Sequence, residues 1–81
     1  MKIAVIGSGS TYTPELVEGL TAHGSELGLK SLYLMDINSE RLRVVGGLVG
    51  RMVAKAGNSF RVELTESRRE AVAGADFVLT Q

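Results

Sequence analysis

A glycine- and hydroxyl-rich segment near the start of the chain has the residue types and spacing that suit phosphate binding. Gly7-Ser8-Gly9-Ser10-Thr11 directly follows a short apolar run. Gly7 permits a tight turn, and Gly9 lets a pyrophosphate approach the backbone, because a Cβ there would collide with it. A helix that begins after the segment would add free N–H groups and the positive end of its dipole. We therefore predict that the segment from Gly7 to Thr11 binds a dinucleotide.

The match to the dinucleotide fingerprint covers two of its three glycines, since Tyr12 holds the third place. Ser10 and Thr11 are the best candidates for contacts with phosphate oxygens, and Ser8 is a further one. The alternative is a strand-to-helix turn that binds nothing and whose hydroxyls cap the helix. Thr13 is the residue that we expect to act as that cap.

A carboxylate stands where such a cofactor would present its adenosine ribose. Asp36 ends the second apolar run, somewhat more than 20 residues past the glycines. There it could accept hydrogen bonds from the ribose hydroxyls, and it would repel a 2′-phosphate, so the sequence favours NAD over NADP. Arg41 follows closely and is a candidate cofactor contact that could instead favour NADP. The alternatives are a strand-end or capping role for Asp36 and a solvated helix position for Arg41.

Strand and helix patterns alternate along the whole chain. Buried-type or alternating apolar runs predict strands, and capped segments with three- and four-residue apolar spacing predict helices. The expected strands are Ile3–Ile6, Leu32–Met35, Arg61–Thr65 and Asp76–Thr80. The expected helices run from Thr13 to about His23-Gly24, from Asn38 or Ser39 to Gly57-Asn58, and from Ser67 to about Ala73. This order predicts an α/β fold, the N-terminal half of a Rossmann-type doubly wound parallel sheet with strand order 3-2-1-4, in which the third strand lies near an edge.

Several other polar or small residues have a structural explanation. Gly46, Gly47 and Gly50 lie in the interior of a predicted helix, with Gly46 and Gly50 one turn apart, and close packing against a sheet or a helix is the expected reason for them. Arg68 and Arg69 could reach a cofactor, but a solvated pair in a first helical turn is the better interpretation. His23 suits the negative end of a helix.

Composition excludes several classes of function. The 81 residues allow one small domain, and 44% hydrophobic with 22% charged residues is typical of a folded, soluble chain. Net charge is zero, so charge alone would attract neither nucleic acid nor membrane. The absence of Cys and the single His exclude thiolate chemistry and multi-histidine metal sites. No apolar run approaches the ~20 residues of a membrane span, and we expect a cytoplasmic protein.

Longer stretches resemble family 4 of the glycoside hydrolases, in its 6-phospho-β-glucosidase branch. The segment from Lys2 to Val17 looks like that branch's cofactor loop, and Thr13-Pro14-Glu15-Leu16 is its most specific part. Asp36-Ile37, Arg68-Arg69-Glu70-Ala71 and Gly74-Ala75-Asp76-Phe77-Val78 match further along. Two positions depart from the family pattern, because Ser8 stands for a frequent glycine and Ser67 for a frequent Asp.

The resemblance implies an unusual hydrolysis of phosphorylated β-glucosides or disaccharides. In the family, NAD takes hydride from C3 of the sugar, a base removes the C2 proton, the aglycone leaves, water adds, and the hydride returns. A divalent metal, expected to be manganese, polarises the sugar oxygens through ligands outside this chain. Residues 1–81 would then be the N-terminal part of an NAD-binding domain of a homo-oligomeric enzyme.

Two other functions fit the residues less well. An NAD-dependent dehydrogenase of the malate/lactate type would carry the third glycine, and a non-enzymatic NAD-sensing module would carry a fuller fingerprint. For the isolated chain we expect no glycosidase activity. We also expect an apolar patch on the sheet face that carries only the short helix.

Overall fold

Four strands and three helices alternate along the chain, as the sequence predicts. The structure, a computed structural model, describes residues 1–9 and 12–80. In chain order the elements are β1 (Lys2–Ile6), α1 (Thr13–Leu27), β2 (Ser31–Met35), α2 (Ser39–Lys55), β3 (Arg61–Thr65), α3 (Arg68–Val72) and β4 (Phe77–Thr80). In the described part of the chain, none of the helices is long and apolar enough to cross a membrane.

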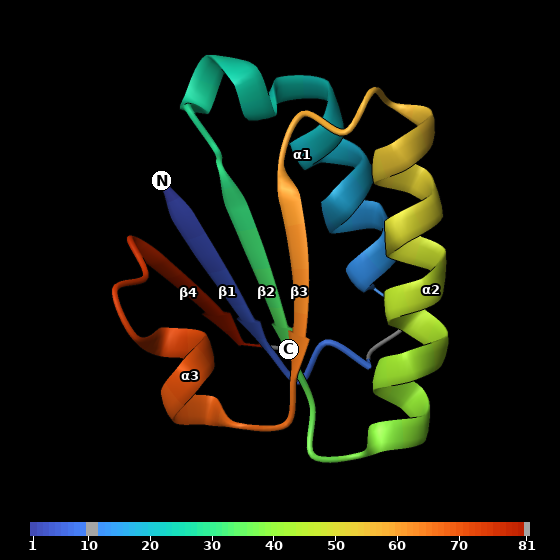
Figure 1. Cartoon of the computed structure of the whole chain (residues 1–81), viewed down its shortest axis with the longest axis vertical. Coiled ribbons are helices and arrows are strands. Elements are labelled where there is room, and N and C mark those ends of the chain that lie inside the picture. The colour runs from blue at the N-terminus through green and yellow to red at the C-terminus, as the bar shows by residue number, and fades with distance from the viewer. Residues whose placement is uncertain (10–11, 81) are drawn as a thin grey trace.

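The strands form one parallel sheet in the order β3-β2-β1-β4, which confirms the predicted order (Figure 1). Ile3 of β1 lies opposite Leu32 of β2 on one side and Phe77 of β4 on the other. β3 is an edge strand of this sheet, as expected. Because all strands run the same way, their carboxyl ends meet at a single edge, which is where ligands bind in open α/β sheets.

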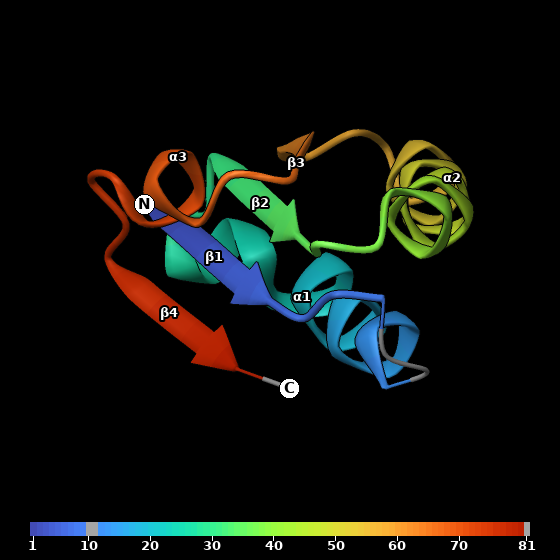
Figure 2. The same ribbon diagram turned by 90° about the horizontal axis from the view of Figure 1, so that it is seen from below.

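The helices divide between the two faces of the sheet as right-handed crossovers require (Figure 2). On one face, Val5 and Leu34 pack with Val17 of α1 and Val49 of α2 in the larger core. On the other, residues of β1 and β2 pack against Ala71 of α3 in a smaller cluster. The two longer helices thus share one face, and the short helix lies on the opposite one.

The exposed apolar side chains of β4 are distributed differently from the prediction. Phe77, Val78 and Leu79 are 58%, 47% and 37% exposed. Successive side chains of a strand point to opposite faces. The register with β1 therefore places Phe77 and Leu79 on the face of the long helices and Val78 on the face of α3. The apolar surface borders the β4 edge on both faces instead of lying on the short-helix face alone.

Helix α1 continues beyond the predicted end near His23-Gly24. It runs to Leu27 and stops at Gly28, which adopts the left-handed conformation with φ of 71°. Gly24 lies within the helix, and its missing side chain makes room for Phe60. A Cβ on Gly24 would lie 3.3 Å from the ring atom Cδ2 of Phe60. A glycine that looks like a helix breaker in sequence is therefore a packing position.

The glycines of α2 have different surroundings from one another. A Cβ on Gly46 would lie 2.7 Å from Leu64 Cδ2 of β3, so the predicted close packing is confirmed there. A Cβ on Gly50 would meet nothing within 4 Å, and the same prediction is wrong for that residue. A Cβ on Gly47 would meet only Arg51 Nη1 of the same helix, at 3.5 Å, so the prediction is wrong there as well. Of the three glycines, Gly46 is the one that allows close contact between α2 and β3.

Candidate cofactor-binding site

The glycine loop is tied to the carboxyl end of β2 by three hydrogen bonds to one carbonyl. The backbone N–H groups of Gly7 and Ser8 donate to Met35 O at 2.8 and 2.9 Å, and Ser8 Oγ donates to the same oxygen at 3.1 Å. Gly7 has φ of 79°, in the left-handed region that favours glycine. The tight turn predicted at Gly7 is present and directs the loop across the end of the sheet.

The side chain of Ser8 points into the protein. It is fully buried, and its O–H and N–H groups both donate to Met35 O. Ser8 therefore joins the loop to β2, and a direct contact between Ser8 and a cofactor stays a prediction. Ser10 and Thr11, the preferred candidates for phosphate contacts, lie outside the described residues.

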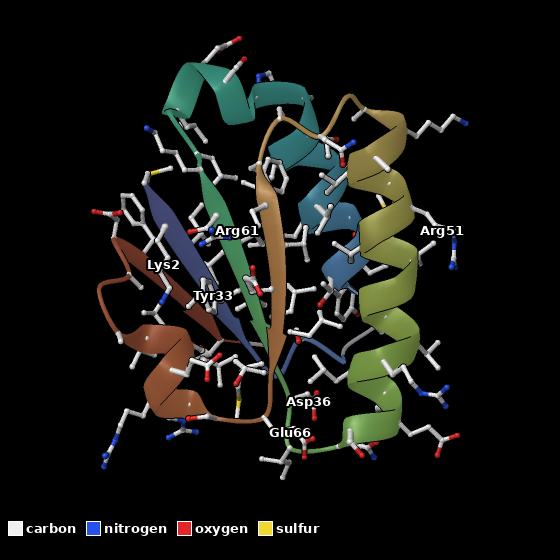
Figure 3. All side chains as sticks on the ribbon, viewed as in Figure 1. Lys2, Tyr33, Asp36, Arg51, Arg61 and Glu66 are labelled. Carbon is white, nitrogen blue, oxygen red and sulfur yellow. The ribbon has the colours of Figure 1, made fainter. Side chains whose placement is uncertain are left out.

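Asp36 is at the centre of the site, where the loop, the end of β2 and the start of α2 meet. Figure 3 labels it at the carboxyl edge of the sheet. Its Oδ2 accepts from the N–H of Gly9 at 2.8 Å, and its Oδ1 accepts from the N–H of Asn38 at 2.8 Å. The residue is only 8% exposed. The structure thus brings together two predicted cofactor residues, Gly9 and Asp36, that are 27 positions apart in sequence.

The surroundings of Asp36 favour its ionised form. The hydrogen bond from Asn38 is the largest effect that lowers its pKa, and those from Gly9 and Ile37 act in the same direction. The positive charge of Arg41 lowers the pKa further, whereas burial opposes all of these effects. The net result is a pKa below the ordinary value of 3.8, so the site carries a fixed negative charge at neutral pH.

The packing explains the glycine at position 9 in a way that the sequence did not suggest. A Cβ on Gly9 would lie 2.6 Å from Asp36 Oδ2 and 2.9 Å from Arg41 Cβ. From the sequence, we expected this glycine to leave the space that a pyrophosphate needs. In the structure, the protein's own side chains already require the residue to lack a Cβ.

The start of α1 differs from the prediction that Thr13 caps it. Tyr12 occupies the N-cap position with helical φ and ψ, and its side chain makes no capping hydrogen bond within the described part of the chain. Thr13 is the first helical residue, is fully buried, and its Oγ1 has no hydrogen-bond partner among the described residues. A residue already inside the helix cannot act as its N-cap, so the sequence reasoning placed the helix start one residue too late.

Asn38 is a residue whose contribution to the site the sequence reasoning missed. Its side-chain oxygen accepts from the N–H of Arg41 at 3.0 Å, which caps α2 where the sequence predicted a helix start. Its backbone N–H holds Asp36 Oδ1. An Asp that accepts from the N–H two residues ahead forms an Asx turn, and the spacing Asp36-Ile37-Asn38 before a helix was the available signal. The guanidinium-bearing side chain of Arg41 is exposed.

Two other features lie apart from this edge. An open groove of about 600 Å³ is bordered by Lys30, Phe60 and Arg61, at the amino ends of β2 and β3 and so at the opposite end of the sheet from Asp36. Among residues 1–9 and 12–80, His, Asp and Glu form no cluster of three that could hold a metal ion. Neither feature belongs to the glycine-loop site.

The fold and the loop define a class. A parallel sheet in the order 3-2-1-4, a glycine turn after the first strand and a carboxylate at the end of the second are the features of a Rossmann-type dinucleotide-binding domain, in its N-terminal half. A family model described as family 4 glycosyl hydrolase matches residues 2–81. The chain therefore belongs to family 4 of the glycosyl hydrolases, and the membership expected from the sequence is confirmed.

Several curated proteins are similar to the whole of this chain. It is 51% identical over 83 residues to a probable 6-phospho-β-glucosidase of Bacillus subtilis (strain 168) and 41% identical over 83 residues to a 6-phospho-β-glucosidase of Escherichia coli (strain K12). These alignments cover 100% of this chain but 19% and 18% of those proteins. The chain thus spans about a fifth of the length of the curated relatives that it matches.

Solved structures show the same arrangement. The chain superposes on a 6-phospho-β-glucosidase from Thermotoga maritima, solved with manganese, NAD⁺ and glucose 6-phosphate, with a TM-score of 0.92 at 37% identity, covering 100% of this chain and 19% of that one. A 6-phospho-α-glucosidase from gut microorganisms, solved with NAD and glucose 6-phosphate, gives 0.94 at 32% identity, covering 100% and 18%. Backbone similarity alone therefore does not separate α- from β-glucosidases.

Proposed function

We propose that this chain is the N-terminal part of the NAD-binding domain of an NAD- and divalent-metal-dependent 6-phospho-β-glucosidase. The observation that carries the proposal is the hydrogen bond from Gly9 N to Asp36 Oδ2 at 2.8 Å, which fixes a buried carboxylate beside the glycine loop. In Rossmann-type domains, these two features bind the pyrophosphate and the adenosine ribose. Family membership supplies the link to glycosidase chemistry.

The residues present fit NAD. Asp36 uses one lone pair on each oxygen for Gly9 and Asn38, and a carboxylate offers about four acceptor positions, so others are left for ribose hydroxyls. The buried Thr13 Oγ1, which has no hydrogen-bond partner among residues 1–9 and 12–80, lies at the first residue of the helix that follows the loop, where an anion is stabilised by the helix dipole. NAD would supply a hydride acceptor, and the residues of this chain would bind and orient it.

A divalent metal does not fit the described part of this chain. It offers no Cys, its one His is His23 beside Glu26, and no cluster of three ligands is present. We therefore assign the metal, proposed to be manganese, and the catalytic base to parts of the protein beyond this chain.

The β-linked substrate is favoured by sequence identity. The chain is 51%, 41% and 37% identical to three β-glucosidases but 32% identical to a 6-phospho-α-glucosidase and 30% to a maltose-6′-phosphate glucosidase. The proposed substrate is a phosphorylated disaccharide or β-glucoside. We further propose a cytoplasmic enzyme, since phosphorylated sugars and NAD are charged metabolites that do not cross membranes freely. We also propose that the enzyme is homo-oligomeric.

The test is an assay of the full-length protein on p-nitrophenyl β-glucoside 6-phosphate, with and without NAD and Mn²⁺. The expected result is cleavage that requires both additions, with little cleavage of the α-anomer. In D₂O, elimination and addition should place deuterium at C2 of the released glucose 6-phosphate. Cleavage that is independent of NAD and leaves C2 unlabelled would overturn the proposal, and preference for the α-anomer would overturn its substrate.

A further inference from the structure

Arg41 packs against the same glycine that donates to Asp36. A Cβ on Gly9 would lie 2.9 Å from Arg41 Cβ and 3.2 Å from Arg41 Cδ, as well as 2.6 Å from Asp36 Oδ2. The aliphatic part of Arg41 therefore lies against the glycine loop. An acidic and a basic side chain, from the end of β2 and the first turn of α2, flank the same point of the loop.

In the described part of the chain Arg41 forms no ion pair, although its positive charge helps to lower the pKa of Asp36. Among residues 1–9 and 12–80, the ion pairs are His23 with Glu26 and Arg61 with Glu63, and neither involves Arg41. The backbone of Arg41 is fixed by the hydrogen bond from its N–H to Asn38 Oδ1, while its side chain is exposed. The backbone of Arg41 is thus fixed, and its exposed guanidinium, which forms no ion pair among the described residues, can be reached by an anionic ligand.

The two charges have opposite effects on a phosphate group. A guanidinium binds phosphate through paired N–H donors, whereas a carboxylate repels it. A neutral ribose hydroxyl can donate to Asp36 without any contribution from Arg41. A ribose that carries a 2′-phosphate faces the repulsion of Asp36 and the attraction of Arg41 together, and the two act in opposite directions.

We propose that Arg41 is a second specificity-determining residue of this site, a cation that binds the 2′-phosphate of NADP once the carboxylate of Asp36 is removed. In the native protein the carboxylate of Asp36 outweighs the attraction of Arg41 and suppresses NADP binding. The inference rests on the proposed function, namely that the glycine loop binds a dinucleotide. It adds that discrimination depends on a pair of opposite charges.

The test measures the affinities of the full-length protein for NAD and NADP by calorimetry. Asp36→Asn should bind NADP at least about tenfold more tightly than the native protein. Adding Arg41→Met, which keeps the stem but removes the charge, should abolish most of that gain. Adding Arg43→Met instead should leave the gain intact, because Arg43 is an exposed residue of the same helix outside the loop contact.

Equal NADP affinity in Asp36→Asn with and without Arg41→Met would overturn the proposal. The proposal would also be overturned if Asp36→Asn still bound NAD but showed no higher affinity for NADP than the native protein. Thermal melting checks the fold of each variant, and Asp36→Ser replaces Asp36→Asn if the latter does not fold. A native protein that binds neither dinucleotide would instead overturn the proposed function.

Discussion

The ammonium group of Lys2 lies 3.8 Å from the centre of the Tyr33 ring, on the face of the sheet that α3 covers. Figure 3 labels both residues. The same Nζ donates to the carbonyls of Glu70 and Ala73 at 3.1 and 2.6 Å. One side chain of β1 thus contacts an aromatic ring of β2 and satisfies carbonyls at the C-terminal end of α3, which attaches this short helix to the sheet.

Lys2→Met should therefore lower the free energy of unfolding by about 1–2 kcal/mol, through loss of the cation–π contact and of hydrogen bonds from a charged donor. Chemical denaturation followed by circular dichroism measures this. Arg51→Met is the control, because Arg51 is exposed on α2 (Figure 3) and should change stability by less than about 0.5 kcal/mol. Equal stability of both variants would show that Lys2 does not hold α3.

Two glycines of the same helix should respond oppositely to alanine. Gly50→Ala should raise the free energy of unfolding by about 0.5–1 kcal/mol, because its Cβ meets nothing and alanine favours the helix. Gly46→Ala should not raise the free energy of unfolding, because its Cβ would lie 2.7 Å from Leu64 Cδ2 and the leucine would have to shift. Urea titrations of both variants give the comparison, and a stabilising Gly46→Ala would mean that α2 does not depend on this close approach.

Gly9→Ala should weaken NAD binding by at least about tenfold, since the new Cβ overlaps Asp36 Oδ2 and displaces the loop from the carboxylate. Fluorescence titration of the full-length protein with NAD measures the loss. Gly19→Ala is the matched control, because a Cβ there meets nothing within 4 Å. Unchanged affinity in Gly9→Ala would place the dinucleotide elsewhere.

Asp36 should make stability depend on pH in the acid range. Its pKa is lowered in the folded protein, so its stabilising contribution is fully present above the ordinary value of 3.8 and is lost as the pH falls through the folded value. The difference in unfolding free energy between the native protein and Asp36→Asn should therefore shrink below that pH. Denaturation curves from neutral pH downward check this, and parallel pH profiles of the two proteins would contradict it.

The isolated 81-residue chain should self-associate through β4. This edge strand exposes Phe77, Val78 and Leu79 and carries no charged residue or proline to discourage pairing. Sedimentation velocity should show dimers or larger species, and Val78→Lys should shift the chain toward the monomer. A monomeric 81-residue chain that binds no hydrophobic dye would show that the exposed β4 edge does not drive self-association. Glycosidase activity is not expected from the isolated chain.

The sequence by itself determined the element order, the parallel sheet and its strand order. Those follow from local signals, namely apolar runs, helix caps such as Ser67, and the handedness of crossover connections. Ser67 Oγ accepts from the N–H of Glu70 at 3.2 Å and so caps the helix that the sequence predicted to begin at Ser67. The sequence also pointed to the glycine loop and Asp36, because strand ends in a parallel sheet share one edge.

Only the tertiary structure decided how those residues meet. The contact of Gly9 with both Asp36 and Arg41, the burial of Thr13 and the packing of Gly24 on Phe60 all join positions remote in sequence or depend on a helix boundary. Local patterns carry no information on which side chain fills the space beside a glycine. That depends on the positions of whole elements, which the core of β1, β2, α1 and α2 fixes through packing.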